Sequence, residues 1–161
     1  MKKLLILFFI LIAADAEAQN NALDYFIGKW DFSLWSAAKK SKLPDRKAVW
    51  ILEKSKDKAD AIGKVIEHGN PITKEQMGFD VGKNLYFRTI TMEDGLFFFS
   101  SKGWEGDKLI WEGHLTTLTG KEIIMKEEIT KVSNEEFKAV FYQKQGEDWV
   151  LVSREELKRQ G

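Results

Sequence analysis

The feature that most constrains the fold is a series of ten short β-prone runs separated by turn residues. Within the runs, β-branched and aromatic residues alternate with polar ones, as in strands that bury one face. Gly, Asn and Asp in the turns tolerate the positive φ of tight hairpins. We therefore expect strands at Trp30–Trp35, Ala48–Ser55, Ala59–Glu67, Gln76–Asp80, Leu85–Thr91, Leu96–Trp104, Lys108–Thr116, Lys121–Lys131, Glu136–Gln143 and Trp149–Leu157.

Ten strands joined mostly by hairpins form a meander, whose two edges stay unpaired unless the sheet closes on itself. Closure predicts a single all-β domain, an antiparallel up-and-down β-barrel of about eight to ten strands. A short helix within Asn20–Ile27 is expected to close one end, with Leu23, Phe26 and Ile27 on one face. The longest connection, Ser36–Lys47, is polar and basic and is a candidate lid over one mouth.

The run Lys121–Lys131 fits two kinds of secondary structure. Its Glu and Lys content is typical of a helix. Ile123, Met125, Glu127 and Ile129 instead lie two residues apart, so they would share one face of a strand, and three of the four are apolar. Since the flanking turns also place the run in register with its neighbours, we favour a strand.

The first 18 residues have the pattern of a secretory leader. Lys2 and Lys3 precede the unbroken apolar run Leu4–Ala14, and two small-x-small patterns follow at 14–16 and 16–18. The run is too short to span a bilayer, which takes about 20 residues; the alternative is a buried N-terminal helix. We expect residues 1–18 to be a signal peptide cleaved at either pattern, and residues 19–161 to form a secreted or periplasmic barrel domain.

Composition and motifs exclude several classes of function. The chain has 25 basic and 25 acidic residues, so no net charge attracts nucleic acid or anionic lipid, and no second apolar run follows the leader. Cysteine is absent, which rules out disulfides, thiolate metal sites, a cysteine nucleophile and a lipoprotein anchor. No phosphate-binding glycine loop or serine nucleophile motif is present. We expect no catalytic residue and no cofactor, and consider a non-enzyme more consistent with the sequence.

Alternation also predicts which side chains face the barrel interior. Arg88 shares a face with Tyr86 and Ile90, and Glu127 lies on the apolar face of its run. A buried carboxylate is costly unless it is paired, so an Arg88–Glu127 pair inside the cavity is one hypothesis. The alternative places both residues outside or at the barrel mouth. The candidate ligand-binding residues are Trp50, Arg88, Phe98, Trp111, Glu127 and Phe141.

The segment Phe26-Ile27-Gly28-Lys29-Trp30 resembles the start of the calycin group, which includes lipocalins, fatty-acid-binding proteins and nitrobindin-like barrels. Over Leu23 to Lys158 the chain resembles a bacterial lipocalin-like family of secreted proteins with no assigned function. The further matching segments, in order, are Met77-Gly78-Phe79-Asp80, Leu85-Tyr86-Phe87, Gly103-Trp104-Glu105-Gly106, Leu109-Ile110-Trp111-Glu112-Gly113 and Glu128-Ile129-Thr130-Lys131-Val132.

Two features of this opening segment have a structural interpretation. Gly28 permits a tight entry into the first strand, and Trp30 then plugs the narrow end of the barrel. The resemblance implies that an arginine from the last strand stacks on this tryptophan. Arg154 is the matching candidate, so Gly28, Trp30 and Arg154 are the predicted barrel-closure residues.

The resemblance to nitrobindin-like barrels also implies haem, held by a histidine late in the chain. This sequence has only His68 and His114, and neither lies late. Haem is therefore not expected, and His114 is the candidate ligand only if haem binds. A two-histidine metal site would need both residues to meet beside a carboxylate such as Glu67 or Glu112. Solvated surface histidines are the favoured interpretation.

Three functions remain open on the sequence. The favoured one is a barrel that binds a small, largely apolar ligand in its interior. The second is a structural or interaction module with a filled barrel, whose exposed aromatics in Phe97-Phe98-Phe99 contact another protein or a second copy in a homodimer. The third is a barrel enzyme that uses Arg88, Glu127 or Tyr142 in the cavity.

Overall fold

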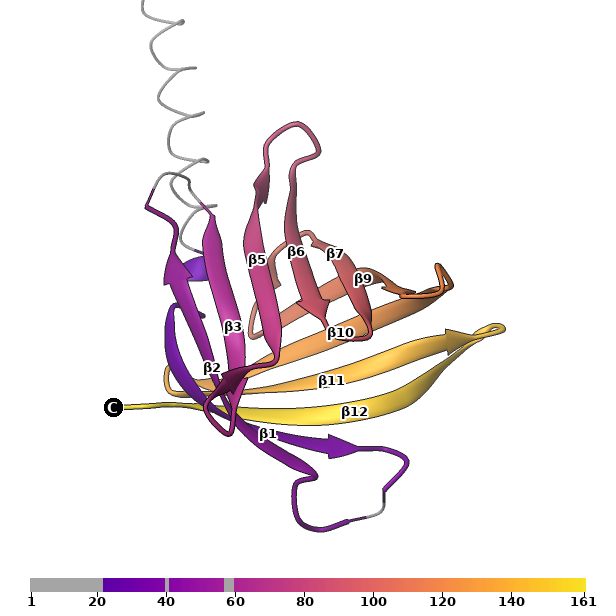
Figure 1. Ribbon diagram of the computed structural model, residues 1–161. Helices are drawn as coiled ribbons and strands as arrows, with labels where there is room; N and C mark the ends of the chain where they lie inside the picture. Colours follow the sequence, from indigo (N-terminus) through magenta and orange to yellow (C-terminus); the bar gives the residue numbers. More distant parts are fainter. Residues whose placement is uncertain (1–21, 40, 57–59) are drawn as a thin grey trace, which may run out of the picture.

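Ten antiparallel strands close into a barrel in the part of the chain that the computed structural model describes, residues 22–39, 41–56 and 60–161 (Figure 1). A single helical turn at residues 22–24 precedes them. The ten strands are β1 (Gly28–Ser36), β2 (Arg46–Lys54), β3 (Ala61–Glu67), β5 (Thr73–Asp80), β6 (Leu85–Met92), β7 (Gly95–Ser101), β9 (Lys108–Thr117), β10 (Glu122–Ser133), β11 (Glu136–Gln145) and β12 (Asp148–Arg159). Two-residue strands, β4 (Asn70–Pro71) and β8 (Trp104–Glu105), pair at the ends of β3 and β9.

Each of the ten strands pairs with the next one along the chain, and β12 pairs back onto β1. Figure 1 shows the last strand, in yellow, lying beside the first, in indigo. The prediction of an all-β, up-and-down barrel is therefore confirmed. The prediction of a strand rather than a helix at Lys121–Lys131 is also confirmed by β10. Met125, Glu127 and Ile129 are buried there, while the residues between them are more exposed.

Most strand boundaries differ from the expected ones by one or two residues, and two differ by three. The run Leu96–Trp104 is not one strand, because β7 ends at Ser101 and Gly103 adopts a φ of 102° before β8 begins. Strand β5 begins at Thr73 rather than at Gln76, so the barrel wall includes three residues that the sequence pattern placed in a loop. One of those three residues, Glu75, is buried in the barrel interior.

The short helix closes one end of the barrel, as expected. Leu23 and Phe26 are buried, and Phe26 accepts a hydrogen bond from Trp30 Nε1 at its carbonyl, at 2.8 Å. Trp104 Nε1 donates to the Ala22 carbonyl at 2.9 Å. Rings from both ends of the chain thus pack into one aromatic cluster, which fills this end of the barrel.

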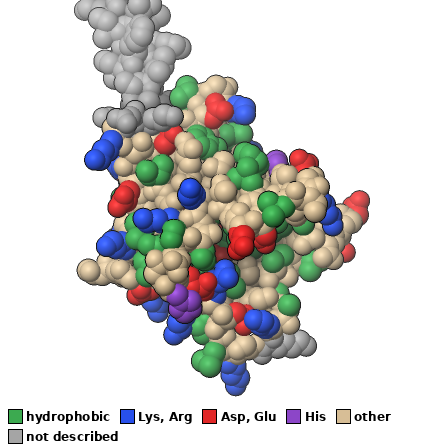
Figure 2. Space-filling model, in the orientation of Figure 1, with side chains coloured by type: hydrophobic (Ala, Val, Ile, Leu, Met, Phe, Trp, Pro, Cys, Tyr) green, Lys and Arg blue, Asp and Glu red, His purple; other side chains and the backbone are tan. Residues whose placement is uncertain are grey.

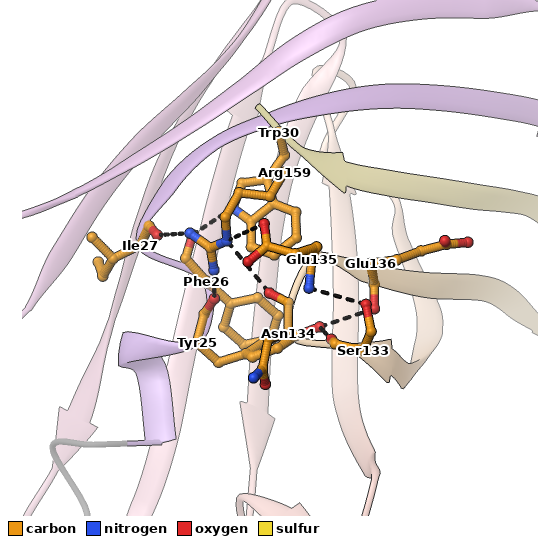
Figure 3. A network of polar contacts seen from close by, with 9 residues as sticks. All are labelled: Tyr25, Phe26, Ile27, Trp30, Ser133, Asn134, Glu135, Glu136 and Arg159. Carbon is orange, nitrogen blue, oxygen red and sulfur yellow. Dashed lines mark hydrogen bonds and ion pairs between the residues drawn. The ribbon is translucent and has the colours of Figure 1, made fainter. Parts of the chain in front are cut away.

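The arginine that stacks on Trp30 is Arg159, and the prediction of Arg154 is wrong (Figure 3). The Arg159 guanidinium carbon lies 4.2 Å from the centre of the Trp30 ring, and its nitrogens donate to the carbonyls of Ile27 at 2.7 Å and Tyr25 at 2.8 Å. Arg154 is exposed on the outer face of β12. The helix segment, the first strand and the last strand are therefore fastened together by one side chain.

The physical reason for this correction is the length and register of the last strand. Strand β12 continues past Leu157 to Arg159, and Trp30 is the direct partner of Arg159 across the β1–β12 ladder. Gly28 has a φ of 133°, and a Cβ at this position would lie 2.7 Å from Arg159 Nη1. Glycine is therefore required at position 28 for two reasons, the positive φ at the entry to the strand and the close approach of Arg159.

The described part of the outer surface mixes both signs of charge, and Figure 2 shows basic and acidic side chains interspersed over the visible face. Among the described residues, no helix is long and apolar enough to cross a membrane. The predicted leader, residues 1–18, lies outside the described residues.

Candidate functional site

The half of the barrel away from the helix holds a cavity of about 200 Å³. Most of its lining is apolar, because strands in a barrel point alternate side chains inward. Smaller side chains such as Val65, Thr73 and Ser153 also line the cavity, and they leave space between the larger ones. The aromatic part of the wall consists of Phe32, Trp50, Phe97, Phe137 and Phe141.

A buried ionic cluster adjoins this cavity: Arg88 and Glu75 line it, and Glu127 is buried beside Arg88. Arg88 on β6 makes ion pairs with Glu75 on β5 and with Glu127 on β10, and all three side chains are almost fully buried. Glu75 also accepts a hydrogen bond from Trp50 Nε1 at 2.7 Å. The interior Arg88–Glu127 pair is therefore present, and the alternative of an exterior or mouth position is excluded.

The ionisation of this cluster follows from burial and from its own charges. Burial disfavours the charged form of Arg88, but Glu127 and Glu75 outweigh it, so the pKa of Arg88 is raised and the guanidinium stays charged. Burial raises the pKa of Glu127, and the neighbouring Arg88 charge opposes that rise. Arg88 is thus a permanent cation that is paired with two carboxyl groups.

A third carboxyl group, Glu155 on β12, faces the same cavity. Burial, together with the negative charges of Glu127 and Glu75, raises the pKa of Glu155 to about 8, and Arg88 only partly opposes this. Among the described residues, its side chain has no hydrogen-bond or ion-pair partner. The cavity therefore contains one carboxyl group that is protonated at neutral pH and free to interact with a ligand.

We expect the free energy of unfolding to fall as the pH rises from about 5 to about 8, through the titration of Glu155. In the unfolded chain this carboxyl has lost its proton above its ordinary pKa of 4.5, whereas the folded protein retains the proton up to about pH 8. Between these two pKa values the folded state binds one proton more than the unfolded state. The stability that this proton contributes decreases as the pH rises and is lost once the proton dissociates from the folded protein.

Glu155→Gln removes this effect. The free energy of unfolding of the variant, measured relative to that of the unmodified protein, should therefore be higher at pH 8 than at pH 5 by about 2–4 kcal/mol. Urea unfolding at the two pH values measures the difference. Glu156→Gln is the matched control, because Glu156 lies on the outer face and pairs with Lys138 at 3.2 Å. An equal effect of Glu155→Gln at both pH values would contradict the assignment.

The other predicted binding residues divide between the interior and the surface. Trp50 and Phe141 line the cavity, as predicted. Trp111 is fully buried but does not line it, and its Nε1 has no hydrogen-bond partner among the described residues. Phe98 is 42% exposed on the outer face, so its predicted place in the interior is wrong. The reason is parity, since Phe97 and Phe99 occupy the inward positions of β7.

His114 lies outside the barrel, where its ring is 5.4 Å from that of Phe98 and its Nε2 is 3.9 Å from Glu122. It therefore does not point toward the cavity in which a haem group would lie. Within the described part of the chain, no group of three His, Cys, Asp or Glu side chains is arranged to hold a metal ion.

Sequence reasoning missed Glu75 and Glu155. Glu75 lies just before the expected start of its strand, so no inward position was assigned to it. Glu155 follows the alternation of Ser153 and Leu157, which are both buried, and this pattern was a usable signal for an inward carboxyl group. What the sequence did not contain was the distance between these groups, because their strands lie apart in the chain.

Comparison with known proteins gives no family for the chain. No family model matches it, and no curated protein matches it. Among solved structures, it is similar to a chain described as EF1p2_mFAP2b bound to DFHBI, with a TM-score of 0.43 and 14% sequence identity. That similarity covers 88% of this chain and 99% of the other. The functional argument therefore rests on the cavity itself.

Proposed function

We propose that this protein binds a small, largely apolar molecule inside its barrel. The observation that carries the proposal is the cavity of about 200 Å³, with apolar walls and a few polar groups on one side. Ligand sites commonly combine apolar walls with a small number of polar groups that orient the ligand. An apolar cavity of about 150 Å³ already admits benzene, so a ligand of about one ring with a short substituent suits this volume.

We further propose that the barrel is a secreted or periplasmic protein of the lipocalin-like kind. The basic and apolar leader with its two small-x-small patterns supports removal of residues 1–18. The closed meander and the helix that covers one end support the lipocalin-like classification of residues 19–161. Mass spectrometry of the secreted or periplasmic product would give its first residue, and retention of residues 1–18 would contradict this proposal.

Two observations bear on the other functions considered. Phe98, Ile110 and Ile124 are exposed on the outer face, which favours an interaction surface, but the hollow interior is not the filled core that a purely structural barrel would have. The raised pKa of Glu155 suits a general acid at neutral pH, which favours an enzyme as the second candidate. Binding remains preferred because burial and the neighbouring charges of Glu127 and Glu75 account for the raised pKa of Glu155 without a catalytic role.

We expect Ser153→Leu to weaken binding of benzyl alcohol, a one-ring probe, by about tenfold or more, because the larger side chain occupies the cavity. Isothermal titration calorimetry measures the affinity. Ser100→Leu is the matched control, since Ser100 is exposed on the outer face of β7. Unchanged affinity in Ser153→Leu would place the probe elsewhere and contradict the cavity as the binding site.

A second measurement separates a binding protein from an enzyme. Native mass spectrometry of the purified protein shows whether a ligand is carried through purification. A ligand that stays chemically unchanged during incubation supports binding, whereas its conversion by the unmodified protein but not by Glu155→Gln would favour the enzyme.

A further inference from the structure

We propose that the ligand is a small organic cation, an apolar body with one ammonium group placed against Glu155. This inference rests on the proposed binding in the cavity and adds the charge of the ligand to it. It comes from the way in which the charged groups of the cavity wall are already paired.

Both arginines that line the cavity already have partners. Arg88 is held between Glu75 and Glu127, and at the mouth Arg46 Nε lies 3.1 Å from Glu67 Oε1. An anionic ligand would therefore have to displace a carboxylate from an arginine. Breaking a buried pair leaves an uncompensated charge, which strongly opposes such an exchange.

The balance of charge inside the barrel favours a cation. Three carboxyl groups, from Glu75, Glu127 and Glu155, face one guanidinium group, from Arg88. A bound ammonium group gives Glu155 the partner that it lacks among the described residues. Within a poorly solvated cavity this attraction is stronger than it is at the surface.

The aromatic wall adds a second interaction for the same ligand. Trp50, Phe97, Phe137 and Phe141 line the cavity, and the faces of such rings attract cations. Trp50 already lies 5.9 Å from the Arg88 guanidinium carbon, so this wall accommodates positive charge. An arylalkyl ammonium ion can pack its ring on these side chains and direct its nitrogen at the carboxyl group.

Binding of a cation should be coupled to loss of a proton from Glu155. The groups that face this carboxyl are Glu127 on β10, Arg88 on β6 and Glu75 on β5, and of the described residues that line the cavity none is a histidine. At neutral pH the free carboxyl holds its proton, and a neighbouring ammonium group favours the ionised form. The affinity for a cation should therefore rise with pH up to about pH 8 and then level off.

The experiment compares three one-ring probes of similar size: benzylammonium, benzyl alcohol and benzoate. Isothermal titration calorimetry with the full folded barrel at pH 7.5 should give benzylammonium an affinity about tenfold or more above that of benzyl alcohol, and benzoate the lowest affinity. Between pH 6 and pH 7 the benzylammonium affinity should rise about tenfold, with release of about one proton, while the alcohol affinity stays constant.

Two variants connect the preference to one side chain. Glu155→Gln keeps the shape and the neutral form of the residue, so it should fold, and it should reduce the preference for benzylammonium over benzyl alcohol to about threefold or less. Glu156→Gln on the outer face should leave the preference unchanged. Thermal unfolding of both variants verifies that each is folded before binding is compared.

The outcomes distinguish this inference from the proposed function. Binding of benzyl alcohol or benzoate as tight as that of benzylammonium would overturn the charge assignment and leave cavity binding standing. Retention of the full preference in Glu155→Gln would also overturn it. No binding of any of the three probes would contradict the cavity as a ligand site and the inference with it.

Discussion

Replacing Arg88 with methionine is expected to lower the free energy of unfolding by about 3–5 kcal/mol. The substitution removes the cation between Glu75 and Glu127, whose carboxyl groups then remain buried without the positive charge that they share. A domain of this size is typically stable by about 5–15 kcal/mol, so the loss is a large part of the total. Urea unfolding at pH 7, followed by tryptophan fluorescence, measures the effect.

The surrounding carboxyl groups provide the test of this mechanism. Adding Glu75→Gln and Glu127→Gln to Arg88→Met should recover about half or more of the lost stability, because it removes the uncompensated charges. Arg154→Met is the matched control, and since Arg154 is exposed it should change stability by about 0.5 kcal/mol or less. A loss below about 1 kcal/mol in Arg88→Met would show that the cluster is not a buried charged unit.

Replacing Trp30 with alanine is expected to cost about 3–5 kcal/mol, the second of the two largest effects. The indole is fully buried at the closed end of the barrel, donates to the Phe26 carbonyl and supports the Arg159 guanidinium. Its removal leaves a cavity and frees the side chain that fastens the helix segment and the last strand to the first (Figure 3). The free energy of unfolding in urea again gives the measurement.

The control for this prediction is another tryptophan in a different setting. Trp149 is 36% exposed near the start of β12 and lies over Lys126 and Lys144, at 5.0 and 5.2 Å. Trp149→Ala should cost about 1–2 kcal/mol, because the ring lies at the surface and its removal leaves no internal cavity. Similar losses in the two variants would contradict the view that Trp30 closes the barrel.

The buried charges have a consequence for selectivity. An apolar wall in place of Arg88, Glu75 and Glu127 would often be as stable or more stable, because the desolvation of charged groups offsets most of their attraction. These three residues, together with Glu155 on β12, instead fix a pattern of charges beside the cavity. Under the proposed function, this pattern distinguishes ligands by charge, which apolar walls alone cannot do.

Much of the fold was accessible from the sequence. Period-two alternation and hairpin residues depend on neighbours in the chain, and they gave all ten strands of the barrel and the inward face of β10. The same alternation allowed an inward Arg88 and Glu127 as one of two alternatives, and the structure decided between them. Two errors arose at strand ends, since Glu75 lay outside its predicted strand and the last strand was ended before Arg159. A third, at Phe98, was an error of parity within β7.

Local pattern by itself thus determined which segments are strands and that the meander must close. The tertiary structure alone decided that Arg159 reaches Trp30, that Arg88 is shared between Glu75 and Glu127, and that Glu155 has no hydrogen-bond or ion-pair partner within the described ranges. Alternation states the face of a residue but not its height along the barrel. Height depends on the register between strands that are distant in sequence, and this register brings the four charged groups to one cavity.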